Sequence, residues 1–131
     1  MRRFIYIFLI ITIYSGLMIF TNSCKQPDPP KATVTVVDEN GRIVEEATVI
    51  IKSFNSNEAN TVIYFEDRTK NIADTQYTNL EGKINYNFKY KAIYSIEAIK
   101  TYRTNPYRKA GTGVLMLEED KTTETTVMIK P

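Results

Sequence analysis

The chain has 131 residues, which is enough for one domain of ordinary size and too few for a second hydrophobic core. It carries 17 Lys and Arg, 15 Asp and Glu and no His, so its formal net charge is +2. Arg2 and Arg3 supply this excess, and from Cys24 onward the charges balance. We expect no nucleic-acid partner, because a neutral chain lacks the positive field that attracts phosphates.

Residues 1–23 have the composition of an export signal. Two arginines are followed by the apolar residues 4–20 and then by small polar residues. Cys24 comes next and is the only cysteine of the chain. Exported proteins usually pair their thiols as disulfides, so a single cysteine at this place calls for a specific explanation.

The segment that ends at Cys24 resembles the signal peptides of bacterial lipoproteins, in the relaxed form found in Bacteroidetes. Ser23 is the small residue that precedes the cysteine in such peptides. The resemblance implies cleavage before Cys24, lipid on its sulfur, and attachment to the outer membrane on its periplasmic or its surface face. Two or three acyl chains would anchor the protein stably. An uncleaved N-terminal membrane helix over residues 4–20 is the alternative.

Residues 24–31 form the predicted tether, since three of the five prolines lie there and keep the backbone extended. From Ala32 onward, residues alternate with period two in short runs that turn formers separate, which is typical of strands. The sequence therefore predicts an all-β fold over 32–131, a single Ig-like β-sandwich of seven to eight antiparallel strands. Its expected strands are residues 32–38, 47–54, 61–66, 72–78, 83–90, 92–102, 113–119 and 122–130.

Residues 52–60 and 102–111 are expected to be the longest loops. Residues 38–41 are predicted to form a turn, because Asn40 and Gly41 tolerate the positive φ of tight turns.

Two stretches resemble the carboxypeptidase regulatory-like domains, a transthyretin-like β-sandwich group. They are "VTVVDENGRIVEEATVIIKS" and "TQYTNLEGKINYNF". The matching positions are Val34, Val36, Asp38, Gly41, Val44, Ala47, Val49, Thr78, Gly82, Ile84 and Tyr86. The resemblance implies tight turns at Gly41 and Gly82, and a domain that folds or docks beside other proteins without catalytic residues of its own.

The side chains available argue against catalysis. Without histidine there is no imidazole acid or base, and a lipidated Cys24 leaves no thiolate for zinc. We therefore expect no enzyme, no cofactor and no metal. The carboxylates around the first turn could surround calcium, but a solvated rim explains them better. These carboxylates are Asp38, Glu39, Glu45 and Glu46.

Residues 90–109 are rich in tyrosine and basic side chains, the composition of binding hot spots. The candidate ligand contacts are Tyr102, Arg103, Tyr107 and Arg108. Tyrosines that simply cover a sheet face are the alternative.

The expected function is a noncatalytic structural or protein-interaction module of the cell envelope. The alternative is a lipoprotein that binds a glycan or a peptide through residues 90–109. The membrane and an envelope protein or glycan are the expected partners, in an oligomeric state that the sequence does not specify.

Overall fold

The computed structural model describes residues 26–54, 62–103 and 107–131. The predicted signal segment and Cys24 lie outside this part of the chain. No helix within the described ranges is long and apolar enough to cross a membrane.

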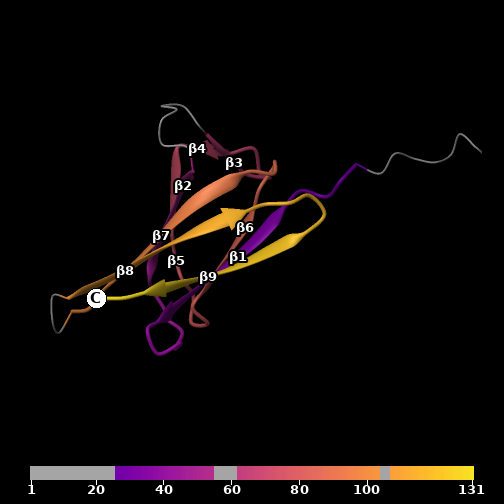
Figure 1. Ribbon diagram of the computed structural model, residues 1–131. Coiled ribbons are helices and arrows are strands. Elements are labelled where there is room, and N and C mark those ends of the chain that lie inside the picture. The colour runs from indigo at the N-terminus through magenta and orange to yellow at the C-terminus, as the bar shows by residue number, and fades with distance from the viewer. Residues whose placement is uncertain (1–25, 55–61, 104–106) are drawn as a thin grey trace, which may run out of the picture.

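The described chain is all β, as predicted (Figure 1). The alternation of apolar and polar residues seen in the sequence is the period of a strand with one buried face. The strands are β1 (Lys31–Asp38), β2 (Thr48–Ser53), β3 (Ile63–Tyr64), β4 (Lys70–Asn71), β5 (Ala73–Tyr77), β6 (Lys83–Asn87), β7 (Ile93–Thr101), β8 (Arg108–Met116) and β9 (Thr122–Ile129).

Two sheets make the sandwich. One has the strand order β6-β1-β9 and the other β5-β2-β7-β8, while β3 and β4 form a small hairpin. The prediction of seven to eight antiparallel strands needs two corrections: the described residues form nine strands, and β1 runs parallel to β9. These two strands lie at opposite ends of the chain, so no tight turn forces them to be antiparallel.

Alternate side chains of both sheets meet in one core. On β1 the residues Ala32, Val34 and Val36 are buried, and opposite them lie Val49 and Ile51 of β2. Each fully buried aliphatic side chain of this size contributes about 1.5–3 kcal/mol to folding. The faces predicted for residues 32–38 and 47–54 are confirmed.

Two turns are closed by polar side chains and a glycine. Asp38 accepts hydrogen bonds from the backbone N–H groups of Asn40 (2.8 Å) and Arg42 (2.9 Å). Gly41 (φ 75°) and Gly82 (φ 69°) have the left-handed backbone that their turns require. The chain then departs from a simple hairpin, because β2 pairs within the other sheet while only Ile43 bridges back to β1.

The end of the tether is tied to the sandwich. The backbone N–H of Asp28 donates to Asp120 Oδ1 at 2.7 Å, and Phe88 donates its N–H to the carbonyl of Pro30 at 2.9 Å. Of the segment 24–31, the part from Asp28 onward therefore belongs structurally to the domain.

The region 102–111 is not a long loop. β8 begins at Arg108 instead of Gly113, and its first residues pair with the end of β7. Tertiary pairing overrides the weak strand propensity of "RKAGTG" here, since glycine and lysine are depleted in strands.

The two sheets also join at this end. Ala110 and Lys130 exchange backbone hydrogen bonds of 2.8 and 2.9 Å, and Figure 1 shows the C-terminus beside the start of β8.

Candidate functional site

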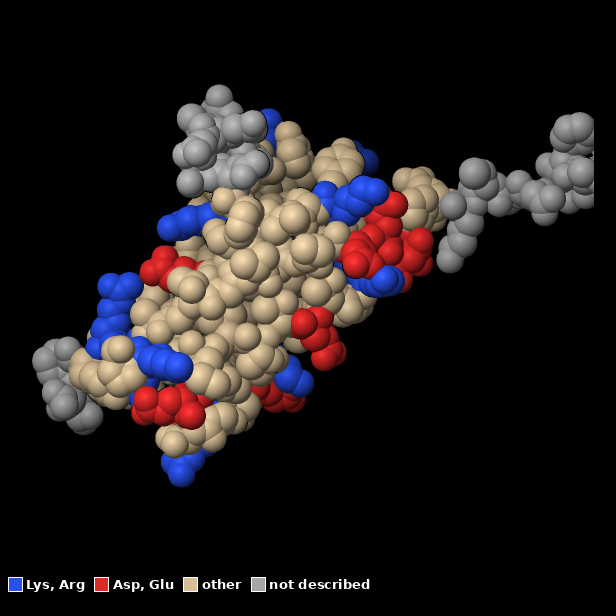
Figure 2. Space-filling model, viewed as in Figure 1, with Lys and Arg blue, Asp and Glu red and all other residues tan. Residues whose placement is uncertain are grey.

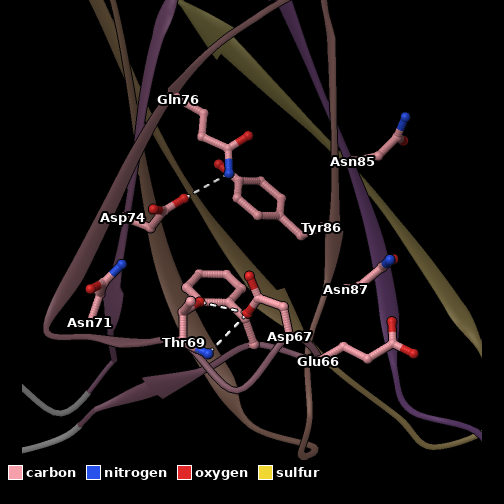
Figure 3. A pocket seen from close by; sticks show the side chains of 10 residues that line it. Glu66, Asp67, Thr69, Asn71, Asp74, Gln76, Asn85, Tyr86 and Asn87 are labelled. Atoms are coloured by element: carbon pink, nitrogen blue, oxygen red, sulfur yellow. Dashed lines mark hydrogen bonds between the residues drawn. The ribbon is translucent and has the colours of Figure 1, made fainter.

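A pocket of about 500 Å³ opens between the two sheets on the side where β5 and β6 are the outermost strands (Figure 3). The end of β4 together with β5 forms one wall, β6 forms the other, and the turn after β3 closes one end. The lining residues are Phe65, Glu66, Asp67, Thr69, Asn71, Asp74, Gln76, Asn85, Tyr86 and Asn87.

Polar residues occupy core-facing positions on β5. Asp74 and Gln76 are register partners of Ile51 and Val49, which are fully buried, so they point to the same inner face. The more apolar side chains of β5 face outward instead, and Tyr77 is 68% exposed. Gln76 Nε2 donates a hydrogen bond to Asp74 Oδ2 at 2.8 Å. Polar groups placed where a sandwich normally has core residues are a sign of a site.

Tyr86 stands opposite, on β6. Its side chain is only 2% exposed, and its hydroxyl oxygen has no hydrogen-bond partner among the described residues. Figure 3 shows the ring directed from β6 toward Asp74 and Gln76. Burial raises the pKa of Tyr86, and the negative charge of Asp74 raises it further. A buried hydroxyl without a partner costs about 1–3 kcal/mol.

The end of the pocket combines an aromatic ring with an acidic turn. Phe65 stacks on the buried Phe88 with ring centroids 5.5 Å apart, and Phe88 in turn stacks on Tyr86 at 5.7 Å. Asp67 Oδ1 accepts hydrogen bonds from Thr69 Oγ1 (2.6 Å) and from Thr69 N–H (2.9 Å). Both bonds lower the pKa of Asp67, the side-chain bond most, so this carboxylate stays ionised.

The pocket is acidic. Glu66, Asp67 and Asp74 line it together with Asn and Gln side chains, and no lysine or arginine is among the lining residues. The ion pairs within the described residues involve none of these three carboxylates. The same residues contain no group of three or more His, Cys, Asp or Glu arranged to hold a metal ion. The arrangement therefore offers hydrogen-bond acceptors, amide donors and the surface of an aromatic ring to a small polar molecule.

The contacts predicted from the sequence lie elsewhere. Tyr102 and Tyr107 stack at the tip of the β7–β8 hairpin with centroids 6.0 Å apart. Arg108 lies on the outer face, 3.5 Å from Glu97, and Arg103 is exposed. Because β8 and β5 are opposite edges of their sheet, these residues form no part of the pocket.

The wider region 90–109 does not form one surface. Tyr94 is buried against Phe88 in the core, at 5.1 Å between centroids, whereas Tyr90 is exposed and contacts Tyr64 edge-on. Lys109 points inward and is only 7% exposed, with its Nζ 3.1 Å from Glu39. This bond raises the pKa of Lys109. The region is divided between core, surface and a structural ion pair.

Charges elsewhere are interspersed. On the face shown in Figure 2, acidic and basic side chains alternate around the rim of a largely uncharged surface. Glu39 and Glu46, two of the carboxylates near the first turn, pair with Lys109 and Lys100. Neither is therefore a free ligand for an ion.

Sequence reasoning missed the pocket, although a signal was present. In "IADTQYT" the polar Asp74 and Gln76 share one face of a strand, and in "NYN" a lone tyrosine stands between two asparagines. Which face of each strand points inward depends on register, which a single sequence does not state.

No protein-family model matches the chain, and a search of curated proteins finds no match. Among solved structures, the chain is similar to a Pseudomonas aeruginosa protein described as a candidate carbohydrate binding protein, with 7% sequence identity. The superposition covers 81% of this chain and 92% of that one, with a TM-score of 0.46. At these values the similarity carries no functional argument.

Proposed function

We propose that this chain is an exported, lipid-anchored and noncatalytic binding module that holds a saccharide in the pocket between β5 and β6. The observation that carries the proposal is the buried Tyr86 hydroxyl, which lacks a partner beside two inward-facing polar residues, Asp74 and Gln76. A native fold keeps so costly an arrangement where a ligand makes use of it.

The chemistry of the lining suits a polyhydroxylated molecule. Sugar hydroxyls donate to carboxylates and amide oxygens, and they accept from amide N–H groups. The exposed part of the Phe65 ring offers an apolar surface for the C–H face of a sugar. The volume of about 500 Å³ lies within the range of ~300–1,000 Å³ that is typical of small-ligand sites.

We propose binding without catalysis, although several carboxylates line the pocket. A glycosidase needs one carboxyl group that is protonated at working pH, which requires a raised pKa. Asp67 has the opposite perturbation, because both of its hydrogen bonds with Thr69 favour the charged form. Asp74 already accepts a hydrogen bond from Gln76.

The test is a titration of the purified domain with neutral and amino oligosaccharides, followed by amide chemical shifts and calorimetry. We expect shifts to concentrate on residues 74–76 and 85–87. Gln76→Ala should weaken binding about tenfold, the value of one hydrogen bond to a charged or polar partner. Thr75→Ala, on the same strand but facing outward, is the control and should leave binding unchanged.

Two results would overturn the proposal. One is shifts confined to Tyr102 and Tyr107, which would move the site to the hairpin tip. The other is the appearance of shortened oligosaccharides on incubation with the protein, which would show an enzyme.

A protein-interaction role is the second candidate, and a specific surface favours it. Four large apolar side chains are exposed toward one end of the sheet β5-β2-β7-β8: Phe54, Ile93, Val114 and Met116. Ile93 and Met116 are register partners, so they lie side by side. Cross-linking and mass spectrometry on native envelopes would identify a protein neighbour through this surface.

A further inference from the structure

We propose that the pocket selects a saccharide that carries a protonated amine, an amino sugar, over neutral and acidic saccharides. The inference rests on the proposed saccharide binding and specifies its ligand class. It stands on two independent observations, the carboxylates without cationic partners and the buried, unpartnered Tyr86 hydroxyl that points toward one of them.

The charges of the pocket are uncompensated. All three ionisable lining residues other than Tyr86 are acidic, and the ion pairs of the described residues involve none of them. A ligand ammonium group supplies the missing positive charge, and its hydrogen bonds to carboxylates are roughly twice as strong as neutral ones. An acidic sugar would bring a further negative charge next to these carboxylates and is rejected.

Asp74 is the principal anchor for the amine. Its Oδ2 accepts from Gln76, which leaves Oδ1 available, and its charge acts directly on the buried Tyr86 hydroxyl. An ammonium group beside Asp74 offers N–H donors to this carboxylate and neutralises its charge.

Asp67 is the second anchor. Both hydrogen bonds from Thr69 go to Oδ1, so Oδ2 is open toward the ligand. In Figure 3 the Asp67 and Asp74 carboxylates both face the space beside the Tyr86 ring, whereas Glu66 points away from it. An ammonium group has three N–H donors and can therefore satisfy more than one acceptor here.

The experiment compares three matched oligosaccharides by calorimetry in a weakly acidic, low-salt buffer: glucosamine oligomers, N-acetylglucosamine oligomers and glucuronate oligomers. The first two differ in whether the nitrogen carries a charge. We expect glucosamine oligomers to bind roughly tenfold more tightly than the acetylated ones, and glucuronate oligomers not to bind.

Asp74→Asn should lower the affinity for glucosamine oligomers far more than the affinity for N-acetylglucosamine oligomers, so that most of the preference is lost. Glu124→Gln removes the same charge from an exposed position on β9, at the far edge of the other sheet, and should leave the preference intact. If Asp74→Asn fails to fold, as judged by circular dichroism, Asp67→Asn replaces it with the same expectation.

The outcomes separate the two proposals. If the wild type binds glucosamine and N-acetylglucosamine oligomers with equal affinity, the amine preference is overturned, whereas the proposed saccharide binding still stands. A loss of preference in Glu124→Gln as large as in Asp74→Asn also overturns it, because the effect would then be one of net charge. Failure of every oligosaccharide to bind overturns the proposed function itself.

Discussion

At the residue scale, Tyr86 combines two opposed roles. Its ring packs into the core against Phe88, while its hydroxyl is withdrawn from water without a hydrogen bond among the described residues. The ring therefore stabilises the fold and the hydroxyl opposes it. Such a conflict is tolerated where function requires the polar atom.

Tyr86→Phe separates these roles. We expect the variant to be more stable than the wild type by about 1–3 kcal/mol, because it removes a buried group that has no partner. Its affinity for saccharide should fall. Urea unfolding and calorimetry measure the two effects, and Tyr94→Phe, a buried tyrosine outside the pocket, is the control for affinity. A large loss of stability in Tyr86→Phe would show that the hydroxyl is hydrogen-bonded.

Asp38 makes the stability of the first turn depend on pH. The backbone N–H of Arg42, and then that of Asn40, lower the pKa of Asp38 below its ordinary value of 3.8. The stabilisation is therefore present above that value and is lost as the pH falls through the lowered pKa of the folded state.

Asp38→Asn keeps an acceptor oxygen in the turn and removes the charge. We expect the variant to be less stable than the wild type at neutral pH and to lose less stability on acidification, so that the two curves converge below the folded-state pKa. Urea unfolding along a pH series measures this. Parallel curves would mean that the charge of Asp38 contributes nothing to the turn.

At the element scale, β8 is the strand that brings the two sheets together. Its inward-facing residues include Gly111 and Gly113, where side chains would fill the space that β9 occupies. A Cβ atom on Gly111 would lie 2.1 Å from the carbonyl oxygen of Met128, a backbone atom. On Gly113 it would meet side-chain methyl groups instead, Val127 Cγ2 at 3.0 Å and Thr125 Cγ2 at 3.9 Å.

Gly111→Ala should therefore destabilise the domain by about 3 kcal/mol or more, at or beyond the upper end of ordinary overpacking, because backbone must move. Gly113→Ala is the matched control and should cost about 1 kcal/mol, since a methyl group can shift. Chemical denaturation of both variants gives the comparison. Equal effects would contradict the close approach of β8 and β9.

At the scale of the whole molecule, the length of the tether determines how far the domain lies from the proposed lipid anchor. The described chain enters the sandwich at Asp28, close to the turn between β8 and β9. Only a few residues then separate the domain from the proposed lipid on Cys24. If Cys24 carries lipid as proposed, a domain on so short a tether would meet ligands near the membrane.

The anchor is tested at Cys24. We expect the wild-type protein to incorporate labelled fatty acid and to show an N-terminus at Cys24 by mass spectrometry, because acylation at the sulfur accompanies cleavage of the signal. Cys24→Ala should incorporate no label. A wild-type protein that retains Met1 and carries no acyl chain would replace the lipid anchor by an uncleaved helix.

Much of the architecture could be predicted because it rests on local chemistry. The buried faces of β1 and β2 follow from Val34, Val36, Val49 and Ile51 at alternate positions, and the turns follow from residues that tolerate positive φ. These signals lie within a few residues of one another. The all-β class and the position of most strands can thus be predicted from the sequence alone.

What only the tertiary structure decided depends on contacts between distant segments. The parallel pairing of β1 with β9, the early start of β8 at Arg108 and the inward face of β5 are all set by partners far along the chain. These pairings create the pocket, because Asp74 faces Tyr86 only when β5 and β6 are the edge strands of two different sheets that pack against each other. A strand's alternation defines two faces, and only packing against the rest of the fold determines which of them is buried.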